Sequence, residues 1–140
     1  MILTVKTKSK TTLVDITSQI QDMIQTSDIQ EGLCFLFVPH TTAAVTINES
    51  ADPSVKADIL MVLNQIIPWE ANYRHMEGNS PAHIKSSLVG ASELIAIENK
   101  RLVLGTWQGI FFCEFDGPRT RKIHMRLLPL EKVQPQQDDH

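Results

Sequence analysis

The segment Leu33–Val38 constrains the fold more than any other, because six apolar residues stand in a row and a proline follows at once. A strand that is apolar on both faces suits a sheet covered on both sides. Pro39 has no N–H to donate and is poorly tolerated inside a sheet, so strand pairing should end there. Alternation over Ala43–Asn48 predicts a second strand. The polar triplet His40–Thr42 therefore lies at a corner between two strands, where polar groups often belong to a site.

The remaining sequence alternates strand-like and helix-like segments without an internal repeat. Helices are expected after Thr17, after Asp52-Pro53 and after Ser80-Pro81, where a capping residue or a proline marks a helix start. The expected strands are Ile2–Lys6, Thr12–Ile16, Gly32–Val38, Ala43–Asn48, Leu94–Glu98, Arg101–Leu104, Ile110–Phe115 and Lys122–Leu128, and Asn99-Lys100 is expected to form a turn. This order predicts one α+β domain over residues 1–132, with antiparallel-rich sheets and about three helices. Residues 133–140 are expected to form a polar C-terminal tail.

Composition excludes some partners. At 140 residues and 42% hydrophobic content, the chain suits one domain. A net charge of −3 argues against a general nucleic-acid binder, because no basic stripe is available to neutralise phosphates. The absence of a signal peptide and of a long apolar run predicts a cytoplasmic protein with no membrane partner. Cys34 and Cys113 lie in apolar strands and are expected to be buried thiols.

Three histidines raise the possibility of a metal site. His40 follows a strand, His75 lies in a loop and His83 lies just inside a helix start, so three separate elements could converge. Three imidazole nitrogens plus a water would make an open zinc site. Their spacing matches no regular metal motif, so locally hydrogen-bonded histidines remain the alternative.

The same region could bind an anion. A helix that starts at Ser80 would present backbone N–H groups and the positive end of its dipole. Lys85 and Arg119 could add charge, with arginine able to hold phosphate oxygens through two parallel hydrogen bonds. Each basic residue alone is typical of a solvated surface, but together they predict a phosphate pocket. Glu114 lies between bulky apolar neighbours in FFCEF and needs a partner such as Arg119, Lys85 or a metal-bound water. It is the candidate general acid or base.

Four motifs together resemble the YjbQ family, also described as secondary thiamine-phosphate synthases. They are HTTAAVTINE at His40–Glu49, the Asn79, His83 and Lys85 pattern, LGTWQGI at Leu104–Ile110, and E-x-D-G-P-R at Glu114–Arg119. The resemblance implies a compact α+β homotrimer. It also implies an enzyme that joins a pyrimidine methyl diphosphate to a thiazole phosphate and releases pyrophosphate, an activity that can be a side activity of the family.

These considerations give a set of candidate residues. The catalytic candidates are Glu114, Arg119 and Lys85; the substrate- or phosphate-binding candidates are Thr41, Thr42, Asn79, Ser87 and Gln108; the candidate ligands of a divalent metal, most simply zinc, are His40, His75 and His83. The expected partners are a small phosphorylated metabolite and further copies of the chain. Two alternatives stay open: a metal-dependent hydrolase of a phosphorylated or amide-containing metabolite, and a non-catalytic trimer that binds a metabolite.

Overall fold

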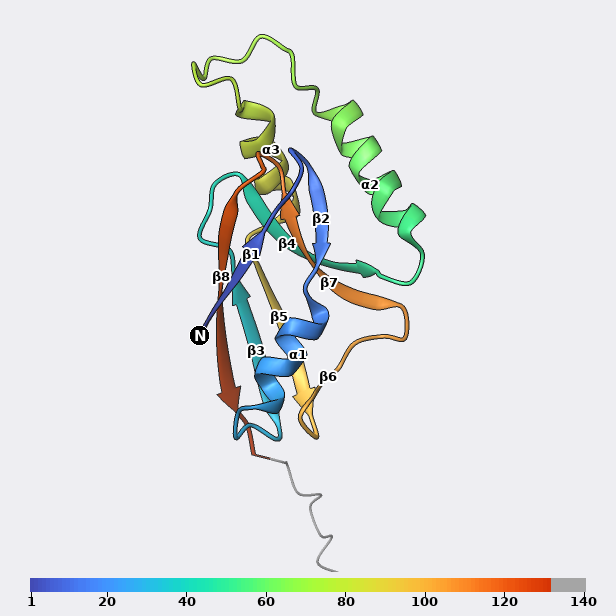
Figure 1. The fold of residues 1–140 in the computed structure, drawn as a ribbon, viewed down its shortest axis with the longest axis vertical. Coiled ribbons are helices and arrows are strands. Elements are labelled where there is room, and N and C mark those ends of the chain that lie inside the picture. The colour runs from blue at the N-terminus through green and yellow to red at the C-terminus, as the bar shows by residue number, and fades with distance from the viewer. Residues whose placement is uncertain (132–140) are drawn as a thin grey trace, which may run out of the picture.

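The computed structural model describes residues 1–131, which form an α+β domain with two antiparallel sheets (Figure 1). In the five-stranded sheet the order is β1 (Ile2–Lys6), β8 (Thr120–Pro129), β3 (Gly32–Phe37), β5 (Ser92–Glu98) and β6 (Arg101–Leu102). In the three-stranded sheet it is β2 (Thr12–Asp15), β7 (Gln108–Glu114) and β4 (Ala43–Glu49). The helices are α1 (Thr17–Gln25), α2 (Pro53–Ile66) and α3 (Ser80–Val89). The α+β prediction is confirmed; the predicted tail, 133–140, lies outside the described residues.

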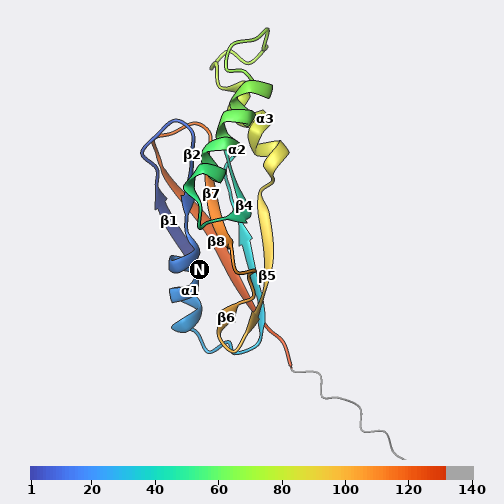
Figure 2. The ribbon, with the colours of Figure 1, turned by 90° about the vertical axis from the view of Figure 1, so that its right-hand side faces the viewer.

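The main core lies between the two sheets. Buried side chains on alternate positions of β3, β8 and β7 pack in one cluster, together with Ile20 and Ile24 of α1. Period-two alternation places these residues on one face of each strand. In both views α1 lies toward one end of the molecule, away from α2 and α3 (Figure 2). The inner face of the large sheet is thus covered by the small sheet and by α1.

A second cluster covers the other face of the three-stranded sheet. Phe111, Cys113 and Phe115 alternate with the residues of the main core and pack against Ala82 of α3 and Leu63 of α2. Cys34 and Cys113 are both buried and free, as predicted. Burial raises the pKa of each thiol to about 12, so both stay protonated at neutral pH. Across residues 1–131, no helix combines the length and apolarity needed to cross a bilayer.

The start of one helix, α2, matches the prediction, whereas the starts of α1 and α3 differ from it. The start of α2 is as expected, because Asp52 accepts a hydrogen bond from the Ser54 N–H at 2.9 Å and a proline follows it. Thr17 was expected to cap α1, but it is the first helical residue, and Asp15 accepts hydrogen bonds from its N–H and its hydroxyl group. The cap position of α3 belongs to Asn79, with Ser80 as the first helical residue.

The strand β8 begins two residues earlier than predicted, at Thr120. A charged residue, Arg121, stands at that point of the sequence, and a charged residue is unusual in a buried strand. Its neighbours on β1, such as Val5, continue the antiparallel pairing up to Thr120. The early start carries the Arg121 side chain into the interior, where the site is built.

Candidate functional site

Two adjoining cavities lie beside the corner between β3 and β4. They share His40, Thr41 and His83. The polar lobe, of about 360 Å³, is lined in addition by Pro39, Thr42, Glu77, Asn79, Arg119 and Arg121. The small-residue lobe, of about 510 Å³, is lined in addition by Ala43, Ser86, Ser87, Gly90 and Ala91. Residues from β4, α3 and β8 thus meet at one place.

A buried ion pair lies beside the polar lobe, and one of its members, Arg121, lines the cavity. Arg121 and Glu114 are 3% and 0% exposed. The Arg121 Nε lies 2.9 and 3.1 Å from the two carboxylate oxygens of Glu114, and its Nη2 also contacts Glu114. The same Nη2 donates to the Thr42 hydroxyl at 2.9 Å. Arg121 therefore ties the start of β8 to the end of β7 and to the corner that carries His40.

Both carboxylate oxygens of Glu114 already accept hydrogen bonds from neighbouring residues. Glu114 also accepts a hydrogen bond from the Thr7 hydroxyl at 2.7 Å and one from the Asp116 N–H at 3.1 Å. Burial raises the pKa of the Glu114 carboxyl, but the hydrogen bonds from Arg121, Thr7 and the Asp116 backbone outweigh burial and leave the pKa below its usual value. Its partner is Arg121 rather than the expected Arg119, Lys85 or a water. An ionised carboxylate without a free lone pair is a structural group, which argues against the predicted role as general acid or base.

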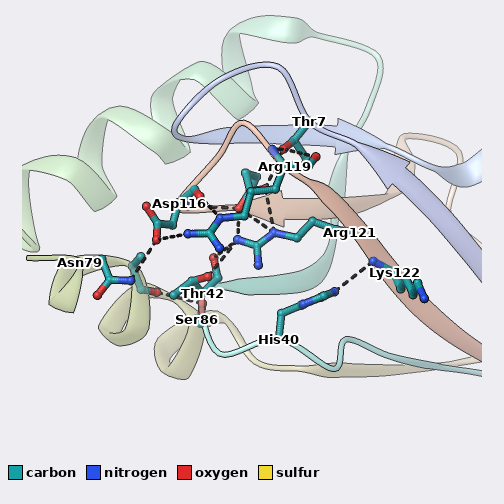
Figure 3. Close-up of polar contacts among 11 residues, drawn as sticks. Thr7, His40, Thr42, Asn79, Ser86, Asp116, Arg119, Arg121 and Lys122 are labelled. Carbon is teal, nitrogen blue, oxygen red and sulfur yellow. Dashed lines mark hydrogen bonds and ion pairs between the residues drawn. The ribbon is translucent and has the colours of Figure 1, made fainter. Parts of the chain in front are cut away.

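Arg119, unlike Arg121, is exposed to solvent. Its side chain is half exposed, and it donates from Nε to the Asp116 carbonyl at 2.7 Å and from Nη2 to the Asp116 carboxylate at 2.9 Å. Asn79 donates to the same carboxylate oxygen at 3.0 Å, while its own Oδ1 is buried without a partner in residues 1–131. Asp116 thus positions both side chains at the rim of the polar lobe (Figure 3). Asp116 lies three residues before Arg119, and this i, i+3 spacing could have predicted their ion pair from the sequence.

His40 is held as a neutral hydrogen-bond donor. Its Nε2 accepts a hydrogen bond from the Lys122 N–H at 3.0 Å, so the neutral ring carries its proton on Nδ1. Burial, and then the positive charge of Arg121, lowers the pKa of His40 below its ordinary value. At neutral pH the ring can therefore donate to an anion without itself being charged.

The three histidines do not form a metal site in one chain. The rings of His75 and His83 meet edge to face, with centroids 5.3 Å apart, and His75 lies 3.7 Å from the exposed Glu77 carboxylate. His40 has already used its Nε2. Within the part of the chain that the structure describes, no three His, Cys, Asp or Glu side chains are grouped so that they could hold a metal. The predicted zinc site thus receives no support from this geometry.

Two predicted site residues lie away from both lobes. Lys85 is 2% exposed and points toward α2, where its Nζ donates to Asn64 Oδ1 at 2.5 Å. Burial, with a smaller effect of Lys10, lowers the pKa of Lys85. Gln108 lies at the opposite end of β7 from Glu114, and its side chain accepts a hydrogen bond from the Gly105 N–H at 2.8 Å. Within one chain, neither residue reaches the space beside His40.

The remaining predicted residues do line the lobes, with different roles. Thr41 is exposed between the lobes, Thr42 is buried with its hydroxyl on Arg121, and Ser87 lines only the small-residue lobe. The start of α3 offers fewer free donors than expected. Proline at position 81 has no N–H, and the N–H groups of residues 82 and 83 bond to the Asn79 carbonyl at 3.0 and 3.5 Å. Positive charge in the polar lobe therefore comes mainly from Arg119.

Comparison with known proteins gives one consistent match. The family model described as UPF0047 protein YjbQ-like matches residues 1–129. The UPF0047 protein YugU of Bacillus subtilis is 50% identical over 127 residues, covering 90% of this chain and 96% of that protein. A UPF0047 protein of Methanocaldococcus jannaschii is 53% identical over 124 residues, covering 89% of this chain and 90% of that protein.

Solved structures agree with this match. The crystal structure of an uncharacterised YjbQ/UPF0047 protein from Clostridium acetobutylicum has a TM-score of 0.89 at 48% identity, and covers 91% of this chain and 99% of that chain. A YbjQ-like protein of unknown function from Sulfolobus solfataricus has a TM-score of 0.88 at 34% identity, and covers 93% of this chain and 96% of that chain. The fold with its two sheets is thus shared with these structures.

Proposed function

This chain belongs to the UPF0047 family of YjbQ-like proteins, and from that membership we propose that it acts on a phosphorylated small metabolite at the two lobes beside His40. The reaction that the sequence resemblance implies is the joining of a pyrimidine methyl diphosphate to a thiazole phosphate, with release of pyrophosphate. In such a reaction negative charge grows on the departing diphosphate. An enzyme that catalyses it needs fixed cations and hydrogen-bond donors at that place.

The observation that carries the proposal is the half-exposed guanidinium of Arg119 at the rim of the polar lobe. Asp116 holds it from two sides, so its direction is fixed before a ligand arrives. His40 adds a neutral donor beside it. A fixed cation next to a neutral donor suits a diphosphate, because the diphosphate gains hydrogen bonds while the site keeps little excess charge when empty.

The buried pair of Arg121 and Glu114 contributes to this site by holding other residues in position. Its charges neutralise each other, so Arg121 serves to hold Thr42 and the His40 corner in place. No step of the proposal uses a metal or Glu114 as a base. Departure of the diphosphate needs stabilisation of negative charge, and the side chains that line the polar lobe can supply it.

The test is turnover by the purified protein. We expect thiamine phosphate and pyrophosphate to form in equal amounts from the two precursors, measured by mass spectrometry and a pyrophosphate assay. Ligand-induced thermal stabilisation without turnover would instead assign the chain to the non-catalytic metabolite-binding alternative. Hydrolysis of a phosphorylated or amide-containing metabolite that a chelator abolishes and zinc restores would instead favour the metal-dependent hydrolase.

We also propose that the chain assembles as a homotrimer through the outer face of the large sheet. Phe37, Leu94 and Leu128 on adjacent strands of this face are between 42% and 59% exposed. Light scattering is expected to give three times the chain mass, and Leu94→Glu is expected to dissociate the assembly by placing a charge in the contact. Met76→Glu is the control, since Met76 is exposed in a distant loop. A monodisperse wild-type monomer would contradict the proposal.

A further inference from the structure

The small-residue lobe differs chemically from the polar lobe beside it. Of the described residues that line it, none is Asp, Glu, Lys or Arg. Two of its polar groups are already bonded: the Ser86 hydroxyl donates to the Ala82 carbonyl at 2.9 Å, and the Gly90 carbonyl accepts from the Val45 N–H at 3.1 Å. A charged group that entered this lobe would lose its water and find no counter-charge, which is costly.

The lobe is also the larger of the two, at about 510 Å³ against about 360 Å³. Its space exists because the wall residues are short. Gly90 ends α3 with φ of +106°, a conformation that favours glycine, and an added Cβ there would meet nothing within 4 Å. Each lobe alone is near the lower end of the size range of ligand pockets, of roughly 300–1,000 Å³.

The two lobes meet at two imidazole rings. His40 and His83, together with Thr41, border both cavities, so a molecule that occupies both must lie against these side chains. His40 presents its Nδ1–H as a donor, because its Nε2 is bonded to the Lys122 N–H. The junction is therefore suited to the ester oxygen or the ring edge of a ligand, whereas full negative charge is best placed beside Arg119.

We propose that the substrate is an organic phosphate whose phosphate or diphosphate group lies in the polar lobe and whose uncharged, ring-sized organic part fills the small-residue lobe. This inference rests on the proposed function, because it assumes that the polar lobe binds phosphate. It adds a specificity-determining surface, formed by Ser87, Gly90 and Ala91, that sets which organic part is accepted. Ser87 and Ala91 are the exposed residues of this surface, and Ser87 can be enlarged without disturbing the core.

The test compares inorganic phosphate with phenyl phosphate by titration calorimetry. Both carry the same anionic group, so the difference between them reports on the lobe that receives the ring. We expect the wild-type protein to bind phenyl phosphate roughly ten- to a hundredfold more tightly than inorganic phosphate, as burial of one aromatic ring predicts. In Ser87→Phe, where the new ring occupies the lobe, the ratio of the two dissociation constants should fall to about one.

Leu88→Phe is the matched control, because Leu88 is exposed on the same helix turn and lines neither lobe. It should keep the wild-type ratio. Equal binding of the two anions by the wild-type protein, or an unchanged ratio in Ser87→Phe, would overturn the inference while leaving the phosphate site intact. Absence of any phosphate binding, or binding that Arg119→Ala leaves unaltered, would instead overturn the proposed function on which the inference rests.

Discussion

Replacement of Arg121 by methionine is expected to lower the free energy of unfolding by about 3–5 kcal/mol. Methionine fills similar space but leaves Glu114 as a buried carboxylate without its cation. A loss of this size is a large share of the roughly 5–15 kcal/mol that stabilises a typical domain. Chemical denaturation at neutral pH measures the change, and unaltered stability would show that the pair is not buried as described.

The loss should depend on pH with a defined sign. In the wild-type protein the pKa of Glu114 lies below its ordinary value of 4.5. The ionised carboxylate therefore stabilises the fold above pH 4.5, and this stabilisation is lost as the pH falls through the pKa of the folded state. In Arg121→Met, burial is no longer outweighed by the guanidinium, and the pKa of Glu114 should rise. The stability gap between the two proteins should therefore be largest at neutral pH and shrink in acid.

Two further variants separate the buried charge from simple loss of contacts. Arg121→Met combined with Glu114→Gln removes both charges and keeps an acceptor for Thr7, so it should be more stable than the single variant. Arg119→Met removes an arginine two positions away whose ion pair with Asp116 is exposed, and it should cost no more than about 1 kcal/mol. Equal losses at the two arginines would contradict the distinction between a buried and an exposed pair.

The elements of this fold were largely predictable because their signals are local. Strand alternation in Ile2–Lys6 and the capping pair Asp52-Pro53 act over a few residues, and the structure has both elements at the expected positions. The turn at Asn99-Lys100 was also correct, with φ of 49° and 63° at its two residues. Helix starts were less predictable where a residue from a distant loop binds the side chain at the cap position. Asn79, for example, bonds to Asp116 and leaves its own helix uncapped.

The partners within the site could not be predicted in the same way. The Glu114 carboxylate was correctly expected to need a partner, but three basic residues lie nearby in the sequence. Only the packing of the sheet that contains β7 against the sheet that contains β8 brings Arg121 to Glu114. Lys85 illustrates the converse. It belongs to a motif with His83, yet two residues apart on a helix point in different directions, so Lys85 faces α2 while His83 faces the lobes.

Replacement of Arg119 by alanine is expected to reduce thiamine phosphate formation by roughly 100-fold or more, the size of loss seen when a fixed donor to a developing anion is removed. The side chain touches the solvent and Asp116, so the fold should not change. Arg119→Lys should recover only part of the rate, because an ammonium group lacks the planar set of N–H donors with which Arg119 contacts both the carbonyl and the carboxylate of Asp116 and still has N–H groups left for phosphate. Rates at saturating and at limiting substrate, with pyrophosphate release as the readout, separate loss of binding from loss of catalysis.

Arg101→Ala controls for the removal of one positive charge, since Arg101 is exposed on β6 and lines neither lobe. It should keep the wild-type rate at all substrate concentrations. If Arg119 stabilises the departing diphosphate, its alanine variant should lose turnover at saturating substrate as well as at limiting substrate, because the interaction strengthens as the C–O bond breaks. A loss confined to limiting substrate would mean that Arg119 only binds the ground state. An unaltered rate under both conditions would remove Arg119 from the reaction and leave the polar lobe without its main cation.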